Sequence, residues 1–188
     1  MRLFARATIL AASALLLAAA PAAAQSIAKP RTWTVTPFLH TSLGMGDPAP
    51  DDSLGLGVGF AYDWTRNLGF EGEVSQLFDV AGDNADIDWS VMNISANAIY
   101  HFDVVRVTPY ATFGLGVERS RHEIVNPDPL VLYPALSATE IAFNFGGGVK
   151  YPLAPRWLVR VDLRRFQAND IAPDYFRLYG GLTFTFGQ

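Results

Sequence analysis

The chain has 188 residues, with 13% aromatic side chains, no cysteine and a formal net charge of −4 at pH 7. This length suggests a single domain, and the lack of cysteine excludes a fold held together by disulfides. The acidic balance argues against nucleic acid as a partner, because nucleic-acid binding depends on clustered lysine and arginine.

The amino-terminal segment has the pattern of a secretory signal peptide. Arg2 and Arg6 provide positive charge, residues 7–20 are apolar, and three alanines precede Gln25. This order is typical of a segment that is removed during export. We therefore expect a signal peptide over residues 1–24 and a short leader over residues 25–31.

The rest of the chain shows β-strand signals that recur between turn signals. No apolar run after Gln25 reaches the ~18 residues that a membrane-spanning helix requires. Alternation of apolar and polar side chains predicts eight strands, over residues 33–43, 53–64, 69–78, 89–102, 108–120, 139–151, 157–166 and 175–186.

The connections between these strands alternate between short and long. The short connections are residues 65–68, 103–107 and 152–156. The long connections are residues 44–52, 79–88, 121–138 and 168–174. In an up-and-down sheet this order places every short turn at one end. Short periplasmic turns and longer extracellular loops are typical of bacterial outer-membrane barrels.

One face of each predicted strand is almost wholly apolar. Leu54, Leu56, Val58 and Phe60 share such a face on the second strand. Aromatic side chains gather near the short turns, which is their usual place at a membrane interface. We expect the apolar faces to contact lipid and the aromatic girdle to comprise Trp33, Trp64, Tyr100, Tyr151, Trp157 and Phe186.

These patterns predict an all-β fold, an eight-stranded antiparallel up-and-down transmembrane β-barrel over residues 32–188. The sheet must close, because an open edge in hydrocarbon leaves backbone polar groups unsatisfied. Eight strands enclose a space just wide enough for side chains to fill. Glycines at the inward positions 55, 57, 59, 114, 116, 146 and 148 are expected to make room for large polar side chains.

The inward faces carry charge. Buried charges are costly unless they are paired and hydrogen-bonded, so we expect a nearly neutral network that fills the lumen. We predict that Arg160 and Arg164 pair with acids on neighbouring strands, with Glu118 and Glu73 as candidates if the network crosses the barrel. An ion path through this network is the alternative. By parity, the lumen charges are Asp63, Glu71, Glu73, Glu118, Lys150, Arg160, Asp162, Arg164 and Arg177.

His40 and Ser42 share one face of the first strand and raise the hypothesis of a hydrolase. The pair is similar to the His-x-Ser of PagL-type lipid A deacylases, although Leu43 follows the serine where that family has asparagine. The first strand also offers no acid to orient the imidazole. We therefore expect a structural histidine and serine, and no catalytic residue.

The long connections are acidic. Solvated loops are the expected state, and loose bridging of divalent cations to lipopolysaccharide phosphates is the alternative. Neither a calcium-loop spacing nor a zinc-ligand spacing is present, so we expect no metal and no cofactor. The acids in question are Asp47, Asp51, Asp52, Asp79, Asp83, Asp86, Asp88, Asp170 and Asp174.

Three stretches resemble the small OmpA/OmpX-like outer-membrane β-barrel superfamily. They are "TPYATFGLGVE" from residue 108, "FNFGGGVKYPLAPRWLVRVDLRRF" from residue 143 and "YGGLTFTF" from residue 179. The resemblance implies a barrel in the bacterial outer membrane that is inserted by the outer-membrane assembly machinery. Membrane lipid and lipopolysaccharide would then surround it.

Taken together, the residues and the resemblance predict a monomeric, non-enzymatic outer-membrane barrel with a structural or surface-interaction role. Two other functions remain open at this point. One is a lipid A-modifying hydrolase of the outer membrane, and the other is a narrow ion channel.

Overall fold

The computed structural model describes residues 29–44, 53–79, 87–104, 106–124, 136–168 and 174–187. None of these segments contains a helix long and apolar enough to cross a membrane. Their strands are β1 (Thr32–Leu43), β2 (Ser53–Asp63), β3 (Leu68–Asp79), β4 (Ile87–His101), β5 (Thr108–Ile124), β6 (Leu136–Ala154), β7 (Trp157–Ala168) and β8 (Tyr175–Phe186).

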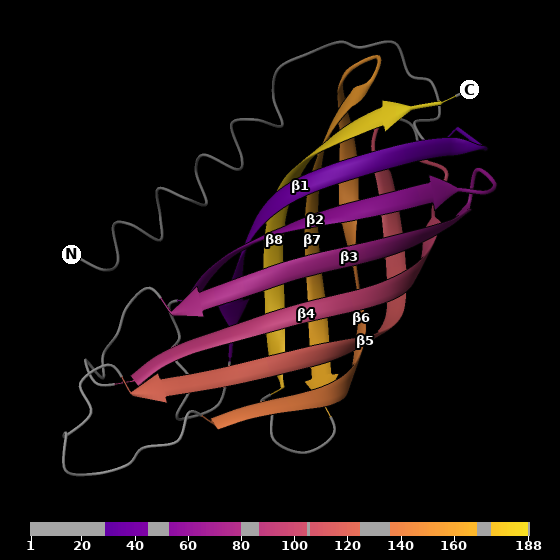
Figure 1. The fold of residues 1–188 in the computed structure, drawn as a ribbon. Coiled ribbons are helices and arrows are strands. Elements are labelled where there is room, and N and C mark those ends of the chain that lie inside the picture. Colours follow the sequence, from indigo (N-terminus) through magenta and orange to yellow (C-terminus); the bar gives the residue numbers. More distant parts are fainter. Residues whose placement is uncertain are drawn as a thin grey trace, which may run out of the picture.

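The strands form one closed barrel in chain order (Figure 1). Each strand pairs antiparallel with the next, and β1 pairs with β8 to complete the ring. Closure gives every strand two neighbours, so no sheet edge is exposed. The fold is therefore the predicted eight-stranded antiparallel up-and-down transmembrane β-barrel.

Two strands are longer than the alternation predicted. β5 continues to Ile124 and β6 begins at Leu136, so both extend past their predicted limits of residues 120 and 139. β6 also continues through Pro152 to Ala154, where we expected a turn. An irregularity in the β6–β7 pairing lies between Pro152 and Ala154. Proline lacks a backbone donor and is tolerated at such a bulge.

Alternation sorts the side chains into an outer apolar set and an inner polar set. On β7, Val161 is 50% exposed on the outside, whereas Leu158 is 7% exposed on the inside. The same parity holds on β2, where Leu54, Leu56 and Val58 are exposed. An apolar exterior around a polar interior is the arrangement that a barrel needs in a bilayer.

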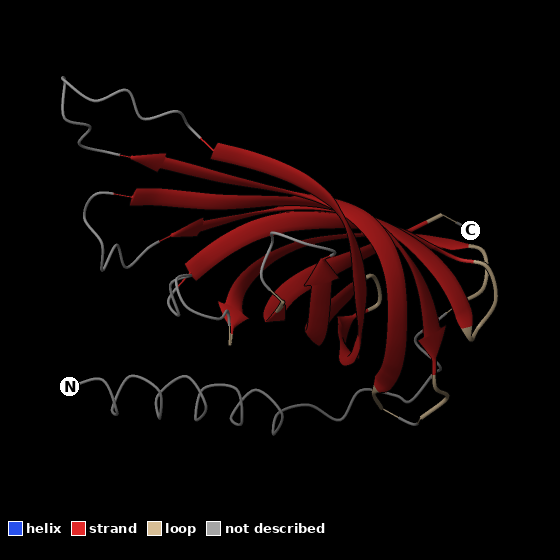
Figure 2. Ribbon diagram, turned by 90° about the horizontal axis from the view of Figure 1, so that it is seen from below, coloured by secondary structure: helices blue, strands red, loops and turns tan. Residues whose placement is uncertain are grey.

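The short turns lie together at the end of the barrel where the chain terminates, drawn in tan in Figure 2. We call this the short-turn end, and we call the opposite end the long-connection end. Backbone hydrogen bonds fix these turns, including Thr65 N–H to the Leu68 carbonyl at 3.0 Å and Phe102 N–H to the Pro109 carbonyl at 2.9 Å.

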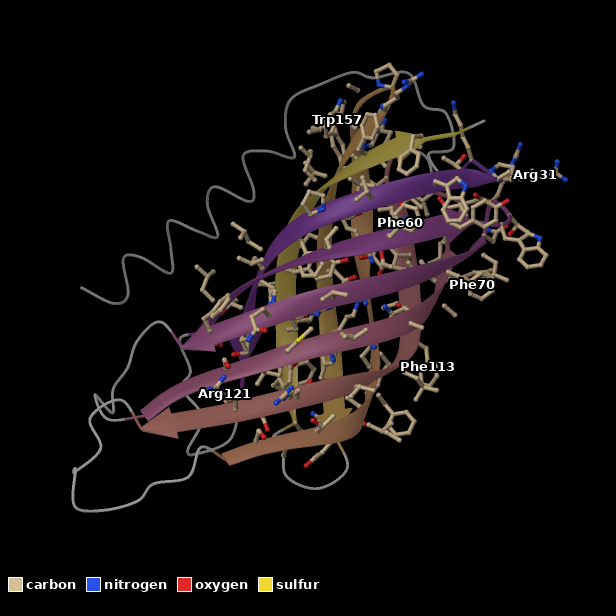
Figure 3. The ribbon with its side chains drawn as sticks, in the orientation of Figure 1. Arg31, Phe60, Phe70, Phe113, Arg121 and Trp157 are labelled. Atoms are coloured by element: carbon tan, nitrogen blue, oxygen red, sulfur yellow. The ribbon has the colours of Figure 1, made fainter. Side chains whose placement is uncertain are left out.

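Aromatic rings surround the outside of the short-turn end. Figure 3 shows Phe60 and Phe70 on the outer side of the barrel, toward the end that holds Arg31. Trp33 contacts Phe60 with ring centroids 5.1 Å apart, and Phe60 lies 6.0 Å from Phe186. Among the predicted girdle residues, Trp33, Trp64, Tyr100 and Trp157 are exposed, whereas Tyr151 and Phe186 are half-buried.

Candidate functional site: the charged lumen

The interior of the barrel holds all nine charged residues that parity placed there. Each is between 0% and 4% exposed. They come from six of the eight strands, because inward positions alternate along every strand. They are Asp63 on β2, Glu71 and Glu73 on β3, Glu118 on β5, Lys150 on β6, Arg160, Asp162 and Arg164 on β7, and Arg177 on β8.

Six of these side chains form one ion-pair network at the centre of the lumen. Arg164 is its hub, because it bonds to Glu71 at 3.0 Å, to Glu73 at 3.3 Å and to Asp162 at 2.9 Å. Arg160 donates to Glu71 from Nη1 and Nη2, and the Nη2 contact spans 3.2 Å. Arg177 completes the network with an ion pair to Glu73 at 2.5 Å.

The network crosses the whole lumen. β3 and β7 stand four strands apart in a ring of eight, so Glu71 and Glu73 face Arg160 and Arg164 from opposite walls. Three carboxylates meet three guanidiniums, which makes this group neutral. A neutral, multiply bonded group can stay away from water without an uncompensated charge.

Two tyrosines that were not predicted as members of the network belong to it. Tyr110 donates to Asp162 and accepts a bond from Arg160 Nε at 2.6 Å. The ring of Tyr179 lies 5.2 Å from the Arg160 guanidinium, 5.5 Å from Arg164 and 5.4 Å from Arg177. The sequence could have indicated both tyrosines, because they occupy inward positions on β5 and β8 in the same alternation as the charged residues.

A second cluster lies nearer the short-turn end. Lys150 Nζ is 2.9 Å from His101 Nε2, and His101 Nδ1 is 3.9 Å from the Asp63 carboxylate. All three side chains are buried. Lys150 and Asp63 therefore balance one another on either side of the imidazole.

Glu118 lies apart from the arginines of β7, so its predicted pairing with Arg160 or Arg164 is wrong. The expectation of partners on neighbouring strands is wrong as well, because the acids that bind these arginines lie on β3 and on β7 itself. Its Oε2 atom accepts bonds from Tyr175 at 3.0 Å and from Asn93 at 3.5 Å. Glu73 does bind Arg164, as predicted. Strand parity identifies the inward face but not the height at which opposite walls meet, which is why Glu71 was not named as the main partner.

Glycines make room for these interior side chains. A Cβ at position 55 would lie 2.3 Å from the His40 ring, and one at position 114 would lie 1.8 Å from Asn97 Oδ1. A Cβ at position 57 would lie 2.3 Å from the Phe38 ring, and one at position 59 would lie 3.1 Å from Glu71 Oε2. At positions 116, 146 and 148 the nearest atoms are backbone carbonyls of the neighbouring strand, so those three glycines permit close strand approach, and the Tyr110 hydroxyl also lies 2.5 Å from position 148.

His40 and Ser42 both point into the lumen but do not pair. The Ser42 hydroxyl bonds to the Ser53 hydroxyl. Neither ring nitrogen of His40 has a hydrogen-bond partner among the described residues. This geometry lacks the contact between base and nucleophile that a hydrolase requires.

Most of the loop acids fall outside the described residues. These are Asp47, Asp51, Asp52, Asp83, Asp86 and Asp170, and the predicted signal peptide lies outside as well. Asp174 is described, and it pairs with Arg165 at 2.8 Å.

An apolar exterior, a closed ring of eight strands and a polar interior suggest comparison with known outer-membrane barrels. The model of the outer membrane protein beta-barrel domain matches residues 10–187. The chain belongs to this family. Family membership places it in the bacterial outer membrane. No curated protein matches it in sequence.

Several solved structures share the fold. Neisserial surface protein A is 17% identical, with a TM-score of 0.66 over 88% of this chain and 100% of that chain. A major outer membrane protein from Thermus thermophilus is 13% identical, with a TM-score of 0.62 over 84% and 100%. The attachment invasion locus protein Ail of Yersinia pestis is 12% identical, with a TM-score of 0.61 over 84% and 100%. At these low sequence identities, the similarity shows a shared fold and nothing more.

Proposed function

We propose that this protein is a non-enzymatic structural barrel of the outer membrane whose lumen is closed by its own charges. The observation that supports this most is the network of Glu71, Glu73 and Asp162 with Arg160, Arg164 and Arg177, which joins opposite walls. An eight-stranded barrel encloses a narrow lumen, and side chains of this size leave little open space in it. A passing ion would have to displace ion pairs that are buried from solvent.

Export and assembly follow the usual route of such barrels in this proposal. The signal peptide is removed before Gln25, the assembly machinery inserts the chain, and the short-turn end faces the periplasm. The barrel is a monomer surrounded by lipid and lipopolysaccharide. The intact mass of the protein purified from outer membranes should correspond to a chain that begins at Gln25, and a chain that retains residues 1–24 would contradict this route.

The structural role predicts a defect of the membrane rather than of one transport process. Deleting the gene should increase entry of a large hydrophobic dye through the outer membrane, because a barrel that stabilises the bilayer is lost. Wild-type protein and the Arg164→Lys variant of the central network should both restore the barrier if the two proteins are present in the outer membrane in similar amounts. Unchanged dye entry in the deletion strain, together with loss of uptake of one small solute, would contradict the proposal and support a channel.

The hydrolase alternative is tested separately at the predicted residues. The lipid A mass spectrum should be the same with the wild-type protein, with His40→Ala and with Ser42→Ala, because Ser42 bonds to Ser53 instead of to His40. Loss of an acyl chain in the wild type that either substitution prevents would establish the enzyme instead.

A further inference from the structure

A hollow lies on the lipid-facing side of the barrel, close to the short-turn end, and we call it the aromatic groove. Its volume is about 470 Å³. One wall is a stack of rings, because the Trp33 centroid lies 5.1 Å from Phe60 and 4.6 Å from Tyr62. The outward-facing residues that line the groove are Trp33, Phe60, Phe70, Gly72, Ala96 and Ala98.

The floor of the aromatic groove has almost no side-chain bulk. Gly72 on β3 lies between Phe60 on β2 and Ala96 on β4, so a large ring is followed by two very small residues. A Cβ at Gly72 would meet no atom within 4 Å. Atoms that border a void lose their dispersion contacts, so a groove in hydrocarbon is filled by an apolar chain that fits it. A lipid acyl chain has this shape and surrounds the barrel.

Exposed arginines lie at the end of the groove that is nearer the short turns. Arg66 is in the β2–β3 turn and Arg106 is in the β4–β5 turn. The backbone N–H of Arg31 donates to the Asp63 carbonyl at 2.6 Å, which places Arg31 beside the end of β2. Figure 3 shows Arg31 at this end of the barrel. Guanidinium groups bind phosphate through paired N–H donors, so a phosphate group is the ligand that suits them.

The short-turn end as a whole is positively charged, although the chain has a formal net charge of −4. Among the described residues of this end, Asp103 is the one exposed acid. None of the ion pairs among the described residues includes one of the exposed cations there. These cations are Lys29, Arg31, Arg66, Arg106 and Arg156. An anionic membrane surface is therefore complementary to this end.

Two of these arginines have a backbone conformation that favours glycine. Arg31 has a φ of 61° and Arg106 a φ of 82°. A residue other than glycine costs free energy in this left-handed region, and such residues gather at functional sites. Arginine at two positions where glycine would cost less favours a role for the guanidinium groups.

We propose that the aromatic groove and its arginines bind one anionic glycerophospholipid, with an acyl chain over Gly72 and the phosphate group at Arg66 and Arg106. This inference rests on the orientation in the proposed function, which directs the short-turn end to the periplasm and so to the glycerophospholipid leaflet. Basic side chains beside an apolar membrane surface attract anionic headgroups. Trp33 and Tyr62 lie at headgroup level, where their rings contact both hydrocarbon and water.

Native mass spectrometry of the refolded, full barrel tests this proposal. The protein in detergent micelles receives an equal mixture of phosphatidylglycerol and phosphatidylethanolamine, and the lipids that stay bound are identified by mass. We expect the wild type to retain one phosphatidylglycerol in preference to phosphatidylethanolamine. Gly72→Leu should abolish this retention, because leucine fills the groove. Arg66→Gln should weaken the affinity about fivefold, because one basic side chain near the headgroup is lost.

Each substitution has a matched control. Gly180→Leu fills another open outward position, in a second groove that lies near the middle of β1, β2 and β8. Arg119→Gln removes an exposed arginine at the long-connection end. Both controls should retain phosphatidylglycerol as the wild type does. Heat-modifiable gel migration verifies that all four variants fold, as expected for changes at lipid-facing or exposed positions.

The proposal is overturned if the wild type retains both lipids equally, if Gly72→Leu keeps the phosphatidylglycerol, or if a control loses as much as its matched variant. A wild type found as two chains, which Gly72→Leu separates, would show that the groove binds a second copy instead. Displacement of phosphatidylglycerol by added lipopolysaccharide would assign this end to the outer leaflet and contradict the orientation. Closure of the lumen is measured separately by conductance, so a failure here leaves that claim standing.

Discussion

At the scale of single residues, the centre of the lumen is organised by the need to pair its buried charges. The alternation of the strands places Arg160, Arg164 and Arg177 inside. It does not give their partners, because contact across a barrel depends on strand tilt and stagger. Glu71 is a partner of Arg164 because the closed ring places β3 and β7 on opposite walls, whereas Tyr179 reaches Arg164 from the neighbouring strand β8.

Removing one charge from the central network should cost more than removing a pair. We expect Arg160→Met to lower the free energy of unfolding by about 3–5 kcal/mol, because Glu71 and Asp162 lose a buried counter-charge. Combining it with Glu71→Gln should cost less than the sum of the two single changes. Urea unfolding of the folded barrel measures all three variants. Additive losses would argue against coupling between these side chains, and Arg66→Met, at an exposed turn, is the control.

The effect of a Gly→Ala substitution on the free energy of unfolding should depend on the space beside the glycine. A Cβ at Gly114 would collide with Asn97 and Asn144, whose side chains share a hydrogen bond of 2.9 Å. We expect Gly114→Ala to lower the free energy of unfolding by about 1–3 kcal/mol. Gly72→Ala meets no atom within 4 Å and should cost nothing or stabilise slightly. Equal effects in a side-by-side urea titration would show that interior space is not limiting at position 114.

At the scale of whole strands, the apolar–polar alternation in the sequence extends only over the part of each strand that lipid covers on one face. The predicted ends of the strands agree closely with the structure where lipid covers one face. β5 and β6 extend further at the long-connection end, where Arg119, Arg121, Ser137 and Thr139 face outward. Polar residues on both faces remove the period-two signal, so the sequence alone could not show these extensions.

The two faces of β7 should respond differently to polar substitution. Val161 lies on the lipid side and Leu158 on the lumen side. Lysine or arginine on the lipid face near the membrane centre costs about 2–4 kcal/mol and an acid somewhat less, so Val161→Asp should reduce the folded fraction in lipid vesicles. Leu158→Asn should retain more folded protein, as judged by heat-modifiable migration. The reverse order would mean that the inside and outside faces have been exchanged.

At the scale of the whole molecule, two independent sequence patterns predicted the architecture of the barrel. The alternation of short and long connections predicted the up-and-down order, and the aromatic residues near the short turns identified the lipid side. The central network needed the closed ring, because its partners lie four strands apart. Sequence patterns describe neighbours along and across strands, whereas contact through the lumen is a property of the assembled barrel.

The central claim is that cross-barrel ion pairs close the lumen, and single-barrel conductance in planar bilayers tests it most directly. The folded wild type should insert without producing steady current steps. The double variant Glu71→Ala with Arg164→Ala removes one side chain from each of two opposite walls. It should open a path through the lumen and produce current steps, because these side chains meet at the centre. A stable, ohmic current through the wild-type barrel at neutral pH, unchanged in the double variant, would contradict the account.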